Sequence, residues 1–142
     1  MKRNMQDTML LIKQLNEKFE AKGTAACSKV GLTISQFRFL VYLKIHPDSQ
    51  VTQREMEKFF KVSHPAVNGV LKRLEEKGFI STELITNGKT QKIVHLEKKG
   101  NEAVEIMDKI RNIDDENLSK EITSQEWEEL YRILSKILNT IS

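Results

Sequence analysis

VTQREMEKFFKVSHPAVNGVLKRLEEKGFI, residues 51–80, predicts two short amphipathic helices joined by a tight turn. Thr52 and Glu55 have the spacing of a capping box, which starts the first helix. Ser63 is a good N-cap for the second helix, and Pro65 falls in its first turn, where a missing N–H costs no helical hydrogen bond. Together these signals form the sequence pattern of a helix-turn-helix.

The second helix of this motif has one apolar and one polar face. The apolar side chains recur at i, i+3, i+4 and i+7, as Val67, Val70, Leu71 and Leu74. On the polar face, His64 and Asn68 can hydrogen-bond base edges, and small Gly69 permits close approach to DNA. An ordinary solvated face is the alternative reading. The candidate DNA contacts are Thr52, Arg54, Ser63, His64, Pro65, Asn68, Gly69, Lys72 and Arg73.

A β-hairpin is predicted directly after the motif. Two stretches rich in β-branched residues, 79–85 and 90–96, flank Asn87-Gly88, the dipeptide preferred in a two-residue type I′ turn. A helix-turn-helix followed by a hairpin is a winged helix, and Lys89 at the tip would reach a phosphate or the minor groove. The register expected from this turn places Thr86 opposite Lys89 and Glu83 opposite Lys92.

Nearly the whole chain resembles the MarR family of bacterial transcription regulators. The resemblance is carried by LTISQFRFL at 32–40, by residues 51–80 and by VHLEKKG at 94–100, between a leading helix and two closing helices. It implies a cytoplasmic homodimer, most often a repressor, whose second motif helix enters the major groove while the wing contacts the minor groove. By position it implies groove contacts from Ser63, His64, Pro65, Asn68 and Lys72, and a wing contact from Lys89.

Two positions depart from the family pattern. Most members carry an acidic residue and an arginine at the wing tip, where this chain has Asn87, Gly88 and Lys89. Because lysine is a hydrated point charge and not a planar fork, we expect a phosphate contact from Lys89. The family also usually has a glycine in the turn where this chain has Lys61.

The expected fold class is mainly α with a small β-hairpin wing (α+β), as one MarR-type domain over residues 1–142. The winged helix is expected over 32–100, with dimerisation helices over 1–22 and 101–142. Apolar stripes at both ends support a helical dimer interface, and Thr123 with Glu126 predicts a capping box for the last helix. The stripes comprise Met5, Met9, Ile12, Leu15 and Phe19, and Trp127, Leu130, Leu134, Ile137, Leu138 and Ile141.

Charge is distributed unevenly along the chain. Residues 53–99 hold ten Lys/Arg against six Asp/Glu, whereas residues 100–142 hold five against ten. This asymmetry suits a protein that presents one surface to a polyanion. One cysteine excludes an internal disulfide framework and suits a reducing cytoplasm. No run of 18 apolar residues is present and the first twenty residues lack an uninterrupted apolar core, so we expect neither a membrane span nor a signal peptide.

An enzyme is not expected. The three histidines, His46, His64 and His95, lack metal-ligand spacing, the six glycines form no phosphate loop, and no cofactor or metal is predicted.

A twofold dimer would set two recognition helices about 34 Å apart and predicts a pseudo-palindromic double-stranded operator. The rival hypothesis is a winged helix that serves as a protein–protein interaction subunit or co-regulator.

The resemblance also implies a switch, commonly a small aromatic or phenolic effector. Arg38 and Tyr42, one turn apart, are candidates to line its pocket, with surface packing as the alternative. Redox sensing through Cys27 is a further alternative, since Lys22 and Lys29 nearby would lower the pKa of its thiol. Cys27 is expected between the first helix and the LTISQF stretch, where a small buried role is the simpler reading.

Overall fold

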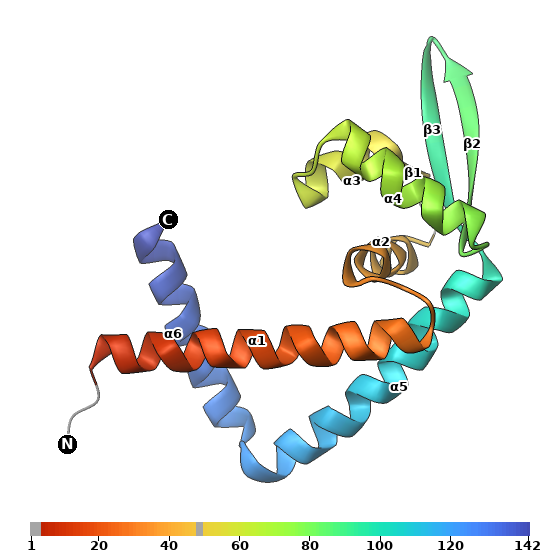
Figure 1. Ribbon diagram of the computed structural model, residues 1–142. Coiled ribbons are helices and arrows are strands. Elements are labelled where there is room, and N and C mark those ends of the chain that lie inside the picture. The colour runs from red at the N-terminus through yellow and green to blue at the C-terminus, as the bar shows by residue number, and fades with distance from the viewer. Residues whose placement is uncertain (1–3, 48–49) are drawn as a thin grey trace. The chain divides into compact units, whose positions relative to one another are not determined.

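The computed structural model describes residues 4–47 and 50–142 (Figure 1). It confirms a mainly helical fold with a β-hairpin wing, and a short third strand, which was not predicted, completes a small antiparallel sheet. Residues up to Met107 form one compact unit, and Asp108–Ser142 form a second. In chain order the elements are α1 (Met5–Lys29), α2 (Ile34–Ile45), β1 (Val51–Thr52), α3 (Gln53–Phe60), α4 (His64–Glu76), β2 (Ile80–Asn87), β3 (Lys89–Leu96), α5 (Lys98–Glu121) and α6 (Ser124–Ile141).

Helix starts follow local side-chain chemistry. The predicted capping box of α6 is confirmed, because the Thr123 hydroxyl accepts the Glu126 N–H and the Glu126 carboxylate accepts the Thr123 N–H. An equivalent box, not predicted, starts α2 at Thr33 and Gln36. Each box satisfies two backbone donors that a helix N-terminus leaves without a helical partner.

Of the two hydrogen bonds in the capping box predicted at the start of α3, only one forms. The Thr52 hydroxyl accepts the Glu55 N–H at 3.0 Å, but the Glu55 carboxylate does not return to the Thr52 backbone. It accepts the Tyr42 hydroxyl of α2 at 2.6 Å instead. Thr52 also ends β1, where it pairs with Ile93 of β3. Tertiary pairing therefore replaces the local bond that the sequence pattern predicted.

The core of the winged helix lies beneath α4. Val67, Leu71 and Leu74 are fully buried, as predicted, and Val70 is half-buried. Helix α3 buries Met56 and Gln53, whereas Phe59 is 60% exposed. The Phe60 ring stacks on Phe39 of α2, and the Phe59 ring contacts Tyr42 of the same helix at a tilt.

Lys61 ends α3 with a left-handed backbone, φ 54° and ψ 46°. Its N–H donates to the Glu57 carbonyl, which also accepts the Val62 N–H at 3.2 Å. This conformation reverses the chain between α3 and α4, and it is the one that favours glycine. Lysine thus takes the turn position that glycine usually fills, and the tight turn is kept.

The wing is the hairpin of β2 and β3, and its predicted register is wrong by one residue. Asn87 pairs with Lys89, so that Gly88 alone forms the tip, at φ 81°. A type I′ turn needs positive φ at both central residues, and Asn87 does not have it. The observed pairs are Thr86 with Thr90, Glu83 with Ile93 and Leu84 with Lys92.

Both long terminal helices expose apolar side chains within their own units. On α1, Met5, Leu15 and Phe19 are exposed over half or more of their surface. On α6, the apolar residues from Trp127 to Ile141 include none that is buried. Across the part of the chain that the structure describes, no helix is long and apolar enough to cross a membrane.

Candidate nucleic-acid interface

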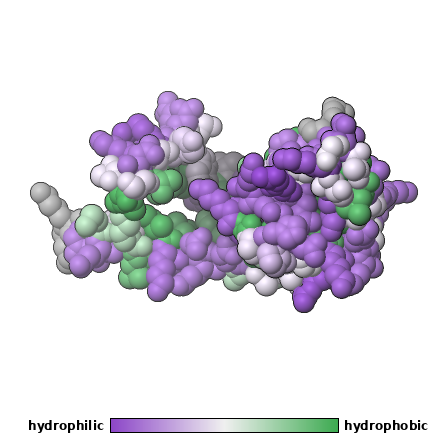
Figure 2. Space-filling model, turned by 90° about the horizontal axis from the view of Figure 1, so that it is seen from above, coloured by the Kyte–Doolittle hydropathy of each residue, from purple (hydrophilic) through white to green (hydrophobic). Residues whose placement is uncertain are grey.

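A groove of about 590 Å³ runs between α3, α4 and the wing. It brings together five of the residues predicted to contact DNA: Thr52, Arg54, His64, Asn68 and Lys89. Figure 2 views the molecule from above the orientation of Figure 1, and the surface of the winged helix that faces the viewer is largely hydrophilic. The other predicted contacts are exposed but do not line this groove; they are Ser63, which caps α4, and Pro65, Gly69, Lys72 and Arg73 on α4.

His64 is held from the side of α3. Its Nδ1 lies 2.7 Å from the Glu57 carboxylate, and the buried Gln53 amide nitrogen lies 3.2 Å from the same ring nitrogen. The carboxylate is the nearer of the two and only accepts, so Nδ1 carries the proton and donates to Glu57. The Gln53 NH₂ group, also a donor, then makes no hydrogen bond to Nδ1, and Nε2 is left for another partner. Glu57 was not predicted as a site residue, since only the folded turn brings its carboxylate to a side chain seven positions away.

Asn68 is tied to the wing. The Lys92 ammonium of β3 donates a hydrogen bond of 3.0 Å to Asn68 Oδ1. The expected register had paired Lys92 with Glu83, and Glu83 instead meets His95 on the same hairpin, at 2.7 Å. Lys92 was therefore not among the predicted site residues, although it lines the groove.

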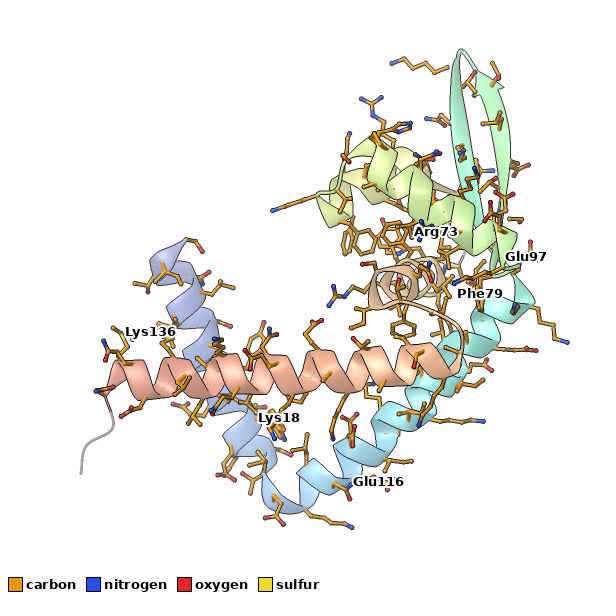
Figure 3. All side chains as sticks on the ribbon, in the orientation of Figure 1. Lys18, Arg73, Phe79, Glu97, Glu116 and Lys136 are labelled. Atoms are coloured by element: carbon orange, nitrogen blue, oxygen red, sulfur yellow. The ribbon has the colours of Figure 1, made fainter. Side chains whose placement is uncertain are left out.

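A second bond joins the base of the wing to the end of α4. The Thr82 hydroxyl lies 3.0 and 2.9 Å from the two Glu75 carboxylate oxygens. With the Lys92–Asn68 bond, it gives the wing two polar attachments along the length of α4. Below them, Phe79 lies where α4 leads into β2, and its carbonyl accepts the Glu97 N–H at 3.0 Å (Figure 3).

The cations of this face are not neutralised by the protein. Among the residues that the structure describes, Arg54, Lys72, Arg73 and Lys89 form no ion pair. All four are exposed, and Lys89 adjoins the glycine at the wing tip. Unpaired cations on one face are available to a polyanion such as the phosphate backbone.

The two residues proposed for an effector pocket have partners within the first unit. Arg38 forms an ion pair of 3.1 Å with Glu20 of α1. Tyr42 is buried, with 6% of its surface exposed, and its hydroxyl donates a hydrogen bond to the Glu55 carboxylate. Arg38 thus has an ion pair on the exposed surface and Tyr42 has a buried hydrogen bond, and a role of either in an effector pocket stays a prediction.

Cys27 lies inside α1 and not after it, because the helix runs on to Lys29. The expectation that nearby lysines lower the pKa of its thiol is wrong: burial raises the pKa, and the charge of Arg38 opposes this more weakly. The thiol is 1% exposed. A buried thiol of raised pKa is a poor nucleophile, so the structure favours the small buried role.

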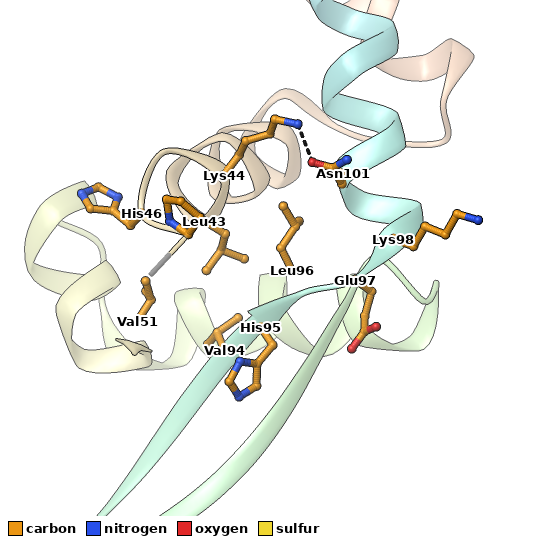
Figure 4. Close-up of a pocket in the computed structure, with 11 residues that line it drawn as sticks. Leu43, Lys44, His46, Val51, Val94, His95, Leu96, Glu97, Lys98 and Asn101 are labelled. Atoms are coloured by element: carbon orange, nitrogen blue, oxygen red, sulfur yellow. Dashed lines mark hydrogen bonds between the residues drawn. The ribbon is translucent and has the colours of Figure 1, made fainter. Parts of the chain in front are cut away.

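A second groove, of about 480 Å³, lies at the base of the wing (Figure 4). Its apolar part comes from Leu43, Val51, Val94 and Leu96. At its edge, the Lys44 ammonium donates to the Asn101 side chain and lies 3.5 Å from Glu105. Within residues 4–47 and 50–142, no group of three His, Cys, Asp or Glu side chains is placed to hold a metal ion.

The Tyr42–Glu55 bond makes a prediction for alkaline pH. Burial, the hydrogen bond and the Glu55 charge raise the pKa of Tyr42 to about 12, from 10. A raised folded-state pKa gives stability that is complete below pH 10 and is lost as the pH rises through 12. We expect Tyr42→Phe to cost about 1 kcal/mol at pH 7, where the hydroxyl bond is lost.

Between pH 10 and 12 the difference in unfolding free energy between the two proteins should shrink. In this range Tyr42 loses its proton in the unfolded wild type but keeps it in the folded one, which stabilises the unfolded state, whereas Tyr42→Phe has no such proton to lose. Urea unfolding of both proteins at several pH values measures it. Tyr131→Phe is the control, since Tyr131 is exposed. A difference between wild type and Tyr42→Phe that stays constant up to pH 12 would contradict the assignment.

Comparison with known proteins agrees with this geometry. Residues 30–88 match the model of the MarR family, and none of the curated protein sequences matches the chain. A DNA complex of MepR from Staphylococcus aureus is similar, with a TM-score of 0.79 and 22% identity over 99% of this chain and 100% of that chain. The MarR regulator of Oenococcus oeni has a TM-score of 0.68 and 22% identity, over 93% of this chain and 98% of that chain. Residues 30–88 are therefore a MarR-family winged helix, and the chain around them has the fold of MarR-type transcription regulators.

Proposed function

We propose that this protein is a cytoplasmic, homodimeric transcription regulator that binds a specific double-stranded operator. In this proposal it acts as a repressor and is released by a small effector. The observation that carries it is the groove between α4 and the wing, where side chains able to hydrogen-bond base edges lie beside unpaired cations. His64 and Asn68 point at this groove from the N-terminal half of α4, the part that reads bases in helix-turn-helix proteins.

DNA-bound relatives in fold support the proposal. MepR has been solved in complex with DNA and also in a DNA-binding conformation, the latter with a TM-score of 0.75 and 23% identity. The dimer is supported by apolar residues that α1 and α6 leave exposed, since an isolated subunit would present these faces to water. A twofold dimer then accounts for a pseudo-palindromic operator.

The effector is proposed to be a small aromatic or phenolic molecule. The groove at the base of the wing is one candidate place for it, because it combines apolar side chains with the cations Lys44 and Lys98. It touches α2, β1, β3 and the start of α5, so that an occupant would act on the elements that carry the wing. Salicylate is a suitable probe, with displacement of bound operator as the readout.

A competition experiment tests specific DNA binding. Operator duplexes are selected from genomic fragments, and binding is then measured at moderate salt against excess random duplex. We expect the selected duplex to survive this competition by about 10³-fold or more. If it does not, the rival role as a protein–protein interaction subunit is favoured.

The wing contact makes a separate prediction. Lys89→Ala should weaken all sequences alike and reduce the slope of log K against log salt by about 0.9, the value for one phosphate contact. Lys109→Ala on α5 is the control and should leave the slope unchanged. An unchanged slope in Lys89→Ala would show that the wing tip does not touch phosphate.

A further inference from the structure

The bond between Lys92 and Asn68 decides which atoms Asn68 can offer to a base. A lysine ammonium has three donors and no acceptor, so the amide atom 3.0 Å from it is the oxygen Oδ1. The orientation of the Asn68 amide is thereby fixed. Its oxygen faces the wing, and its NH₂ group is left as the free polar group of the side chain.

Among the described residues, Lys92 forms no ion pair, so Asn68 is its observed polar partner. Two carboxylates line the same groove, and each already accepts a hydrogen bond from another side chain. Glu55 accepts the Tyr42 hydroxyl, and Glu57 accepts the His64 ring N–H. Leu84, which pairs with Lys92 across the hairpin, adds only an apolar side chain to the groove. Removal of Oδ1 from Lys92 would therefore leave a half-buried ammonium without its acceptor.

This arrangement changes the base that Asn68 fits. An unconstrained asparagine reads adenine with two bonds, in which its oxygen accepts from N6 and its NH₂ donates to N7. Lys92 uses one lone pair of Oδ1, and its ammonium, 3.0 Å from that oxygen, would lie beside the N6 donor of adenine and oppose the first of these bonds. Towards a base, the Asn68–Lys92 pair therefore presents chiefly donors, from the amide NH₂ and the remaining ammonium N–H groups. The base edge with two acceptors in the major groove is guanine, at N7 and O6.

We propose that the Asn68–Lys92 pair is a specificity determinant that selects guanine over adenine in each half of the operator. This inference rests on the proposed function, since it needs α4 in the major groove. Lys92 thus acts from the wing on a base that the recognition helix reads. The preference should be about tenfold or more, in the range of one well-placed base contact.

The test uses the full chain and an operator selected from random duplexes. The base pair that matters is the one whose preference Asn68→Ala abolishes. At that position we expect the wild type to favour guanine, and 7-deazaguanine, which lacks the N7 acceptor, to weaken binding severalfold. Lys92→Met keeps the aliphatic stem but removes the donors, so that it frees Oδ1 and should move the preference towards adenine.

Lys89→Met is the matched control, because Lys89 lies on the same strand but has no amide partner. It should weaken binding without any change in base ranking, and circular dichroism verifies that each variant is folded. The inference is overturned if the wild type favours adenine at this position, or if Lys92→Met weakens all duplexes equally. Those results leave the proposed function intact, whereas failure to select any operator overturns both.

Discussion

Gly100→Ala should destabilise the winged helix by about 3 kcal/mol or more and lower its Tm by roughly 10 °C or more. A Cβ atom at this position would lie 2.3 Å from the Phe79 carbonyl oxygen and 2.6 Å from Cδ1 of Leu96. The carbonyl is backbone and already accepts the Glu97 N–H, so it cannot move without loss of that bond. Differential scanning calorimetry of the full chain measures the change.

Gly69→Ala is the control for this substitution. Gly69 also lies in a helix, but a Cβ atom there would meet nothing within 4 Å. Alanine is about 1 kcal/mol more favourable than glycine in a helix interior, so this variant should be more stable than the wild type. If both variants change Tm by the same amount and in the same direction, the close packing of Gly100 against Phe79 is not the reason why a glycine is needed there.

Leu134→Glu combined with Leu138→Glu should convert the proposed dimer to monomers and weaken operator binding by about 10² or more. Both leucines are exposed on α6, at 40% and 63%, so the substitutions leave the buried core of the first unit unchanged. Two glutamates in an apolar dimer interface would be desolvated without a partner. Each half-site would then be bound alone, without the gain from a linked second site.

Light scattering after size exclusion measures the mass of the assembly, and a gel-shift titration measures the affinity. Lys136→Glu is the control, since it changes charge on the same helix between the two leucines. It should leave the dimer intact. A dimer of unchanged mass and affinity in the double variant would show that this face of α6 is not the interface.

Local signals predicted the helical framework well. Ser63 caps α4 and Pro65 lies in its first turn, as the sequence indicated, and Val67, Leu71 and Leu74 form the expected buried stripe. These features depend on residues within a few positions of one another, so that their spacing alone determines them. The α6 capping box was predictable for the same reason.

Features that depend on distant residues were not predictable. Thr52 and Glu55 have the same spacing as the α6 box, but Tyr42 competes for the Glu55 carboxylate. The preferred turn of Asn87-Gly88 suggested one register, and pairing along the whole hairpin set another. The spacing of residues within one element could not show either effect, because in both cases the partner that competes comes from another element.

The candidate site also has a part that the sequence predicted and a part that it did not. Exposed residues of α4 followed from helical periodicity, and His64 and Asn68 do line the groove. Their partners did not follow, since Glu57 and Lys92 reach them across the turn and from the wing. The sequence thus indicated which side chains face outward, but not which of their atoms are already occupied.

Between the Lys92–Asn68 bond and its tip, the wing makes no side-chain bond to other elements within residues 4–47 and 50–142. From Thr86 to Gln91 every residue is exposed, and the only side-chain bond described there joins Thr86 to Thr90 within the hairpin. Its length is therefore free to vary without cost to the core. Insertion of one residue in each strand would carry the tip about 3.3 Å further. In the proposed regulator, the length of the wing can thus change how far along the DNA its tip reaches while α4 stays as it is.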